Sequence, residues 1–292
     1  MGEVRLAPSL AGECSTQAPG LQPAIIAHWS RQTALAWILD KLLEEGISAP
    51  TVRDVARFDQ IHAGGARAVL ELAALTPIST GQRIVDLGAG LGGAARVLTD
   101  NFRCQSVCVE LAPRLAAAGQ ALTELVGFGA RVWHVAGDAA RTPLASTSFD
   151  GVWVQHLALH FPDSTALWSE AERLLRPGGW LAFHEWLRGD GPDLLFPSPW
   201  SPEDGSLSHL DESDALVSGL TQAGFGNIRI VDVSAQMAER YCRQRVALRA
   251  QPRVSNPILP EDEALVALEN AEQNLREARA ICVMGVAYRT DA

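Results

Sequence analysis

The stretch that decides the fold is RIVDLGAGLGG, at residues 83–93. Its first half is a short apolar run that ends in an acidic residue, and its second half is a series of closely spaced glycines. A continuous apolar run is typical of a strand buried on both faces, and glycines allow a tight turn into the N-terminus of a helix. The stretch therefore predicts a strand–turn–helix unit whose main-chain amides can approach a ligand closely.

Short apolar runs alternate with longer amphipathic segments on the C-terminal side of this unit. Strands are expected at 83–87, 106–110, 130–136, 151–155, 180–186 and 227–233, with a last run at 279–288 that would close the sheet. Helices are expected between them at 92–100, 113–125, 164–175 and 212–223. Strict alternation of strand and helix predicts an α/β fold with a doubly wound, mostly parallel seven-stranded sheet.

The remaining segments are expected to form a tail, a cap and two insertions. Residues 1–22 are rich in Pro and Gly without periodicity, which is the composition of a disordered tail. Helical spacing at 28–45 and at 63–75 predicts an N-terminal helical cap over residues 23–78, before a nucleotide-binding domain at 79–292. Within that domain, 187–210 is expected to be a lid and 234–279 a helical insertion.

Composition restricts the function classes. The chain has 292 residues and a formal charge of −10, which disfavours a nucleic-acid partner because phosphate backbones would be repelled. No apolar run suggests a signal or a membrane anchor. Five scattered cysteines without a CxxC pair favour a reducing compartment, so a cytoplasmic location is expected. A single lysine, Lys41, with abundant Arg and Ala suggests a GC-rich bacterial source.

Acidic residues follow two further predicted strands. Glu110 lies 22 residues after Gly88, about where an acidic residue reaches ribose hydroxyls in nucleoside-binding folds, and Asp138 follows the third strand. Taken alone, the glycines could form a plain turn, and each carboxylate could simply be solvated. Taken together, they indicate a nucleoside site at the crevice of the sheet. A nicotinamide-dependent dehydrogenase shares the glycine turn and the ribose acid and remains the alternative.

The sequence resembles the class I S-adenosylmethionine-dependent methyltransferases. The resemblance rests on residues 85–92, Glu110, 137–139, 149–153 and the Leu-Leu-Arg-Pro-Gly-Gly turn at 174–179. It implies S-adenosyl-L-methionine as cofactor, a Rossmann-like fold and methyl transfer. It also implies that Asp86, Gly88 and Gly90 hold the methionine end, Glu110 the ribose and Asp138 the adenine. Further implied cofactor contacts are Gln60, Leu111, Ala139 and Gln155.

A narrower resemblance covers most of the chain after residue 25. The segments at 59–65, 155–156, 196–200 and 274–277 are similar to the sarcosine/dimethylglycine N-methyltransferase group. This implies a small-molecule acceptor and a natural-product tailoring N- or O-methyltransferase, without a nucleic-acid or membrane partner and with a homodimer left open. The alternatives are a C-methyltransferase of secondary metabolism and a cyclase-like protein that binds the cofactor but transfers no methyl.

Histidines and aromatic residues are the candidates on the acceptor side. His156 and His160 would share one face if their segment is helical, and a neutral imidazole suits a proton acceptor; His62 is the third catalytic candidate. Each histidine could instead be a satisfied wall residue. We expect no metal site, because spacing fixes no third ligand beside His156 and His160, although His184 and Glu185 lie nearby. Trp186, Phe196 and Trp200, in or beside the expected lid, are the candidate substrate contacts.

Overall fold

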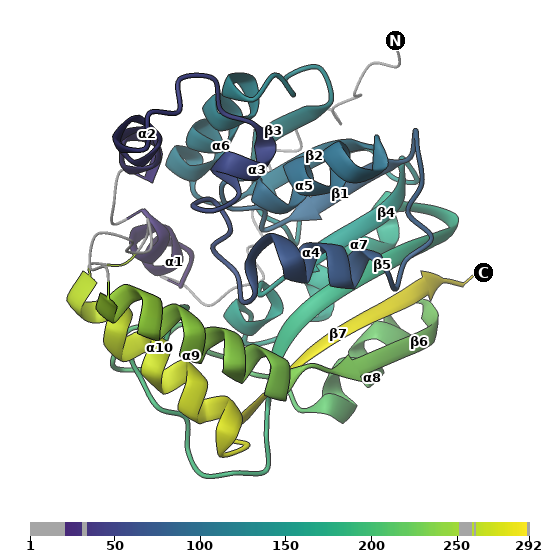
Figure 1. The fold of residues 1–292 in the computed structure, drawn as a ribbon. Coiled ribbons are helices and arrows are strands. Elements are labelled where there is room, and N and C mark those ends of the chain that lie inside the picture. Colours follow the sequence, from purple (N-terminus) through teal and green to yellow (C-terminus); the bar gives the residue numbers. More distant parts are fainter. Residues whose placement is uncertain (1–20, 31–33, 251–258, 260, 291–292) are drawn as a thin grey trace.

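The computed structural model describes residues 21–30, 34–250, 259 and 261–290. Seven strands form one sheet in the order β3-β2-β1-β4-β5-β7-β6, and every pairing is parallel except those of β7 with β5 and β6 (Figure 1). The strands are β1 (Arg83–Leu87), β2 (Gln105–Glu110), β3 (Val132–Ala136), β4 (Phe149–Gln155), β5 (Leu175–Arg188), β6 (Phe225–Asp232) and β7 (Ala280–Arg289). The expected α/β fold and the expected seven-stranded sheet are therefore confirmed.

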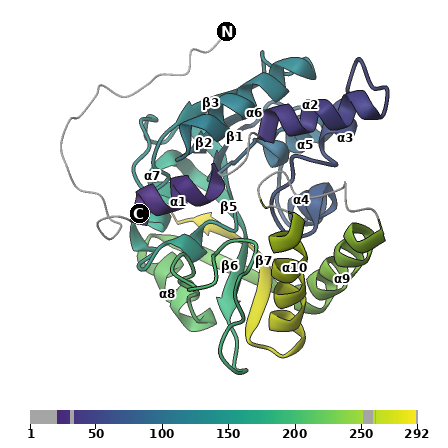
Figure 2. The same ribbon diagram turned by 90° about the vertical axis from the view of Figure 1, so that its left-hand side faces the viewer.

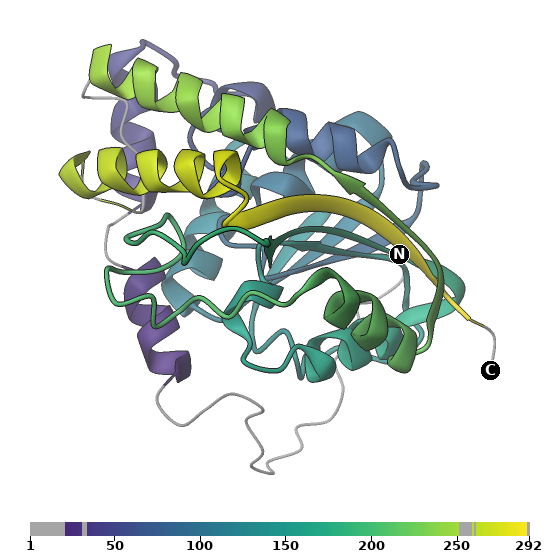
Figure 3. The same ribbon diagram turned by 90° about the horizontal axis from the view of Figure 1, so that it is seen from below.

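Helices cover both faces of this sheet. The described helices are α1 (Leu21–Trp29), α2 (Ala34–Glu44), α3 (Val52–Val55), α4 (Gly65–Ala73), α5 (Gly93–Phe102), α6 (Pro113–Leu125), η1 (Ala158–His160), α7 (Thr165–Leu174), α8 (Ser213–Gln222), α9 (Ser234–Ala250) and α10 (Glu261–Arg276). One apolar layer joins α4, α5, α9 and α10 to the sheet around Trp153, Trp180 and Trp186. A second layer packs α7 and α8 on the opposite face. The side views in Figures 2 and 3 show these two layers on either side of the twisted sheet.

The N-terminal helices differ from the sequence-based expectation. The single helix expected at 28–45 is wrong: α1 and α2 are separate, and residues 31–33 between them lie outside the described part. Each helix has its own packing partner, since α2 contacts α3 and α6 while Trp29 of α1 reaches His160. Tertiary contacts of this kind override a periodic pattern. The tail expected at 1–22 ends early, because α1 begins at Leu21, and its first 20 residues are not described.

Several element bounds also shift. The helix expected at 63–75 spans only Gly65–Ala73, because Gly64 at its start has a positive φ of 83°. The fifth strand is longer than expected, as it runs through the Arg-Pro-Gly-Gly turn from Leu175 to Arg188. The short helix α3 was not expected from the sequence; Thr51 and Asp54 stabilise it through a capping box. None of the helices in the described residues is long and apolar enough to cross a bilayer.

Candidate cofactor and acceptor site

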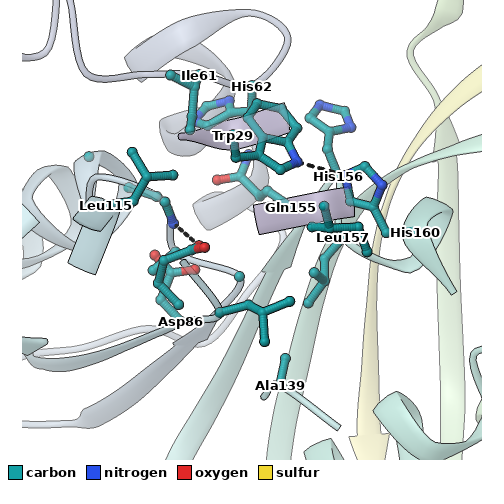
Figure 4. Close-up of a pocket in the computed structure, with 18 of the residues that line it drawn as sticks. Trp29, Ile61, His62, Asp86, Leu115, Ala139, Gln155, His156, Leu157 and His160 are labelled. Carbon is teal, nitrogen blue, oxygen red and sulfur yellow. Dashed lines mark hydrogen bonds between the residues drawn. The ribbon is translucent and has the colours of Figure 1, made fainter. Parts of the chain in front are cut away.

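A pocket opens at the carboxyl ends of β1 to β4, which is where open α/β sheets bind ligands. Figure 4 shows that its wall comes from distant parts of the chain: Asp86 ends β1, Ala139 follows β3, Gln155 ends β4, and Trp29 belongs to α1. Helix α1 thus covers a pocket that the sheet forms.

The glycine turn after β1 forms the floor of the pocket. Gly88 and Gly90 have φ values of 72° and 55°, a conformation that side chains rarely adopt. A Cβ on Gly88 would lie 2.8 Å from Leu157 Cδ1, and one on Gly90 would lie 2.7 Å from Ile61 Cδ1. The glycines are therefore needed both for the turn and for the close approach of its neighbours.

Two carboxylates, Glu110 and Asp86, lie at this floor. Glu110 Oε2 accepts a hydrogen bond from Gly90 N at 2.9 Å, and Glu110 Oε1 accepts one from Ala112 N at 2.8 Å. Asp86 is buried, and its Oδ2 has no hydrogen-bond partner within the described residues. Burial, together with the nearby charge of Glu110, raises the pKa of Asp86 to about 8. Asp86 is thus an unsatisfied carboxyl that a cationic ligand group would stabilise in its ionised form.

Helix α1 is tied to the far wall of the pocket at two points. Gln22 Nε2 donates to Asp138 Oδ2 at 2.8 Å, while Asp138 Oδ1 accepts from Ala140 N at 2.9 Å. Trp29 Nε1 donates to His160 Nε2 at 3.2 Å, the dashed contact in Figure 4. Asp138 therefore already accepts from a side-chain amide at the place where a ligand amino group is expected.

The two histidines after β4 have different environments. His160 Nδ1 donates to Leu207 O at 2.9 Å and its Nε2 accepts from Trp29, so both ring nitrogens are engaged. His156 has a positive φ of 52° and precedes η1, so the two rings do not share one face of a regular helix. Neither ring nitrogen of His156 has a partner among the described residues. Burial, and then the neighbouring His184, lowers the pKa of His156 well below 6.5. His156 is therefore neutral, and both of its ring nitrogens are available for a hydrogen bond to a ligand.

Comparison with known proteins places this geometry in a family. Residues 85–183 match the family described as Methyltransferase domain. These residues form a class I S-adenosylmethionine-dependent methyltransferase domain. The match spans the glycine turn, the acidic strand ends, His156 and most of β5.

Two relatives of the methyltransferase domain are distant, each below 30% identity. The chain is 29% identical over 191 residues to glycine/sarcosine/dimethylglycine N-methyltransferase of Actinopolyspora halophila, covering 63% of this chain but 33% of that protein. It is 28% identical over 190 residues to methyltransferase GfsG of Streptomyces halstedii, covering 63% of this chain and 66% of that one. This chain therefore spans only a third of the first relative's length.

A solved structure shows the same fold. The similar structure is named "putative sarcosine dimethylglycine methyltransferase from Galdieria sulphuraria". It superposes on this chain with a TM-score of 0.64 and 21% sequence identity. The superposition covers 78% of this chain and 85% of that one. At this identity the likeness establishes the fold alone.

Most of the site residues expected from the sequence line the pocket of the methyltransferase domain. They are His62, Asp86, Gly88, Gly90, Glu110, Leu111, Asp138, Ala139, Gln155, His156 and His160. Gln60 lies instead in the wall of a neighbouring cavity, and its Nε2 donates to Asp59 Oδ1 at 2.7 Å.

The expected aromatic contacts do not line this pocket. Trp186 and Trp200 are buried and pack on each other with ring centroids 4.3 Å apart, on the far side of His156. Phe196 packs over Gly205 within the 187–210 segment. None of the three is among the residues that line the pocket, and Trp186 lies beside His156 with ring centroids 6.1 Å apart.

Sequence reasoning missed a buried ion pair behind the glycine turn. Arg96 Nη2 donates to Asp59 Oδ2 at 2.7 Å and to Leu91 O at 2.6 Å, with both charged side chains almost fully buried. The pair ties the segment before α4 to the helix that follows the turn. No spacing rule links Asp59 and Arg96, which are 37 positions apart. The available signal was Arg96 itself, a charged residue inside the helix that follows the glycine turn.

A second cluster beneath the pocket has metal-ligating residue types but unsuitable hydrogen bonds. Ligand atoms of His156, His184 and Cys282 lie within 4.8 Å of one another. However, Trp153 Nε1 donates to Gln155 Oε1 at 2.7 Å, so Gln155 Nε2 faces His184 Nδ1 at 3.3 Å. His184 Nδ1 must then accept, which places the ring proton on Nε2, 3.2 Å from Cys282 Sγ. A metal on Nε2 would need the other tautomer, so these contacts oppose a metal ion at this cluster.

The residues of the pocket fit the cofactor that the family implies. The unpartnered oxygen of Asp86 suits an ammonium group, Glu110 presents a carboxylate to hydroxyls, and Asp138 accepts from an amino group. The positive φ values of Gly88 and Gly90 leave the floor without side chains. Three acceptors, placed for an ammonium group, for hydroxyls and for an amino group, match an amino acid joined to a nucleoside.

Proposed function

We propose that this protein transfers a methyl group from S-adenosyl-L-methionine to a small-molecule acceptor. The observation that carries the proposal is the convergence of Asp86, Glu110 and Asp138 from three successive strands on one pocket above the glycine turn. Relatives named as methyltransferases of glycine, sarcosine and dimethylglycine and of sterols, together with methyltransferase GfsG of Streptomyces halstedii, support this reaction class.

In this proposal each carboxylate binds one part of the cofactor. Asp86 accepts hydrogen bonds from the ammonium group, and ionises as it does so. Glu110 accepts from the ribose hydroxyls while its backbone bonds keep the turn in place. Asp138 accepts from the adenine amino group after Gln22 gives way or shares the carboxylate. Leu111 and Ala139 supply apolar walls to the adenine.

His156 is the proposed proton acceptor on the opposite wall. When bound, S-adenosylmethionine supplies an electrophilic methyl group on sulfur and leaves as a neutral thioether. An acceptor lone pair forms the new bond to carbon, and the acceptor proton passes to His156, whose nitrogens have no other partner among the described residues. Because a base is useful only for an acceptor that loses a proton, we propose N- or O-methylation of an ammonium, alcohol or phenol, as in tailoring of natural products.

His160 and His62 have other proposed roles. The two hydrogen bonds of His160 hold η1 against α1 and against the segment at 187–210, so this residue positions the wall. His62 lies 6.2 Å from His156 between ring centroids and lines both the pocket and the cavity beside it. It is therefore the residue that an acceptor entering from that cavity would meet.

The test is a transfer assay with methyl-labelled cofactor and a panel of small amines, amino acids, alcohols and phenols. Label should appear in at least one acceptor together with one equivalent of S-adenosylhomocysteine. The same label in a carbon-linked product would refute the N- or O-assignment but keep methyl transfer. Cofactor binding with no labelled product across the panel, but with rearrangement of an acceptor, would favour a cyclase-like protein instead.

A further inference from the structure

A second cavity lies next to the cofactor pocket and has a different character. It has a volume of about 400 Å³ and lies between the 56–65 segment and helix α9. His62 lines both cavities, so it marks the place where they adjoin. Any ligand held in the second cavity therefore lies beside the wall from which the methyl group would be transferred.

The charged side chains that line this second cavity are all arginines, and each has a carboxylate partner just outside the lining. Of the described residues that line it, Arg57, Arg240 and Arg243 are basic and none is acidic, although the whole chain carries a formal charge of −10. Burial, then His62 and then Arg240 lower the pKa of His184, so the charge of Arg240 is felt at that histidine. A concentration of positive charge in an acidic protein attracts anions to that place.

Arg240 is held so that one nitrogen stays available. Its Nη2 donates to both carboxylate oxygens of Glu71 at 2.6 Å, which fixes the guanidinium. Its Nη1 lies 3.9 Å from Met237 Sδ, a weak acceptor, and so close to Gly64 that a Cβ there would be 2.4 Å away. Nη1 therefore has capacity for a stronger acceptor brought by a ligand.

Arg243 is the most readily recruited of the three arginines. Its nearest carboxylate is Glu239 at 3.6 Å, and both side chains are more than two-thirds exposed. Exposed pairs of this kind contribute about 0–1 kcal/mol, so a ligand can replace Glu239 at little cost. Arg57 is bound more firmly, because Nη1 and Nη2 both donate to Glu45.

His62 supplies an independent indication of an anion. Gln60 Nε2 donates to Asp59, so Gln60 Oε1 faces His62 Nε2 at 3.0 Å, and His62 Nδ1 lies 3.3 Å from Ala63 O. Gln60 Oε1 and Ala63 O are both acceptors, and the His62 ring can donate to both of them only when both of its nitrogens carry a proton. Burial nevertheless lowers the pKa of His62 to about 4, so the ring is neutral and one contact lacks a proton. An anion beside the ring would stabilise the protonated form that satisfies both.

The rest of the cavity wall is apolar. Trp37 and Phe58 stand on one side, with ring centroids 5.7 Å apart, and Leu248 lies on the other. Such walls bury carbon skeletons, while a few charged groups fix orientation.

We propose that the methyl acceptor is an organic anion, a carboxylate or phosphate ester, whose charged group binds Arg240 and Arg243 while its nucleophilic atom passes His62 toward the cofactor. This inference rests on the proposed function and names the substrate class of that same site. The charged group anchors the acceptor at the far end of the cavity, and the apolar walls hold its body.

The test is calorimetric titration of the protein loaded with S-adenosylhomocysteine, using phenyl phosphate, phenylacetate and the neutral phenylacetamide at low salt. At least one anion should bind ten or more times more tightly than the amide. Tighter binding of phenyl phosphate would identify a phosphate ester, and tighter binding of phenylacetate a carboxylate. Equal binding of the amide and both anions, or no binding of the anions, would overturn the proposal.

Matched variants locate the effect. Arg243→Gln should weaken the preferred anion at least fivefold and leave the amide and S-adenosylhomocysteine unchanged. Arg249→Gln on the same helix removes the same charge outside the cavity and should change nothing. Equal weakening by both variants would mean that net charge alone is responsible and would contradict the proposal. Arg240→Gln should weaken the anion further, with its fold checked by circular dichroism because Glu71 loses one of its two arginine partners and keeps only Arg67.

The loading step separates the two hypotheses. If S-adenosylhomocysteine fails to bind, the proposed function fails, and the same probes titrated into the cofactor-free protein still decide whether the cavity prefers anions. If it binds and the anions do not, the substrate class is wrong while the methyltransferase proposal stands.

Discussion

Glu110→Gln is the substitution whose effects can be worked out most fully. Glu110 accepts from two backbone amides, Gly90 N at 2.9 Å and Ala112 N at 2.8 Å, and it is 9% exposed at the pocket edge. Glutamine has nearly the same shape, but one of its two terminal atoms is a donor. One of the two buried backbone N–H groups therefore loses its acceptor, which costs about 1–3 kcal/mol in the free energy of unfolding.

The same substitution should weaken the cofactor. In the proposed role, the ribose hydroxyls donate to a charged carboxylate, and such bonds contribute about 1.5–3 kcal/mol. At about 1.4 kcal/mol per factor of ten, the dissociation constant of S-adenosylhomocysteine should rise roughly 10- to 100-fold. Glu124→Gln, on the exposed face of α6, is the matched control and should change neither quantity.

Two assays on each variant separate the roles: urea unfolding without cofactor, and calorimetric titration with S-adenosylhomocysteine. A loss of stability with an unchanged dissociation constant would make Glu110 only an anchor of the glycine turn and would refute its ribose role. An unchanged free energy of unfolding would show that the hydrogen bonds from Gly90 N and Ala112 N to Glu110 contribute little to stability.

Four further predictions concern groups in the pocket and behind its glycine turn. Because the pKa of Asp86 is about 8 in the protein, it is protonated near pH 7, and pairing with an ammonium should release up to one proton; calorimetry in buffers of different ionisation enthalpy should detect this release, and Asp86→Asn should abolish it. His156→Gln should lower kcat by about 10²- to 10⁴-fold while cofactor affinity changes less than twofold, and full activity would leave catalysis to positioning alone. Because the pKa of His156 lies well below 6.5, the base is neutral above that pKa, and wild-type kcat should not fall between pH 8 and pH 6.5 through its protonation. Arg96→Met should cost about 3–5 kcal/mol of stability, since it leaves Asp59 buried without its cation, and a smaller loss in urea unfolding would show that Asp59 ionises little.

The sequence predicts the sheet, and it predicts which residues at the strand ends line the pocket, because both depend on local patterns. Strand–helix alternation follows from hydrophobic periodicity, and the glycine turn at 88–90 leaves a direct signature of positive φ. Glu110 and Asp138 reach the pocket simply because parallel strands end at one edge of the sheet.

The acceptor side depends on contacts that no local pattern records. Trp186 and Trp200 were expected to meet a substrate, but they pack on each other under His156. Helix α1 was not expected, since the predicted helix began only at residue 28, and its position is set by Gln22 and Trp29 reaching across the pocket. The two contacts of α1 join residues more than 100 positions apart, so they emerge only once the chain is folded.

The most direct test of the central claim is calorimetric titration of the unmodified protein with S-adenosylmethionine, S-adenosylhomocysteine and NAD. Binding of both sulfur nucleosides with dissociation constants near 1 μM, about −8 kcal/mol, and no binding of NAD is the result expected from the pocket described here. Failure of both sulfur nucleosides to bind would contradict it, and would mean that the glycine turn and its three carboxylates maintain the fold without holding this cofactor.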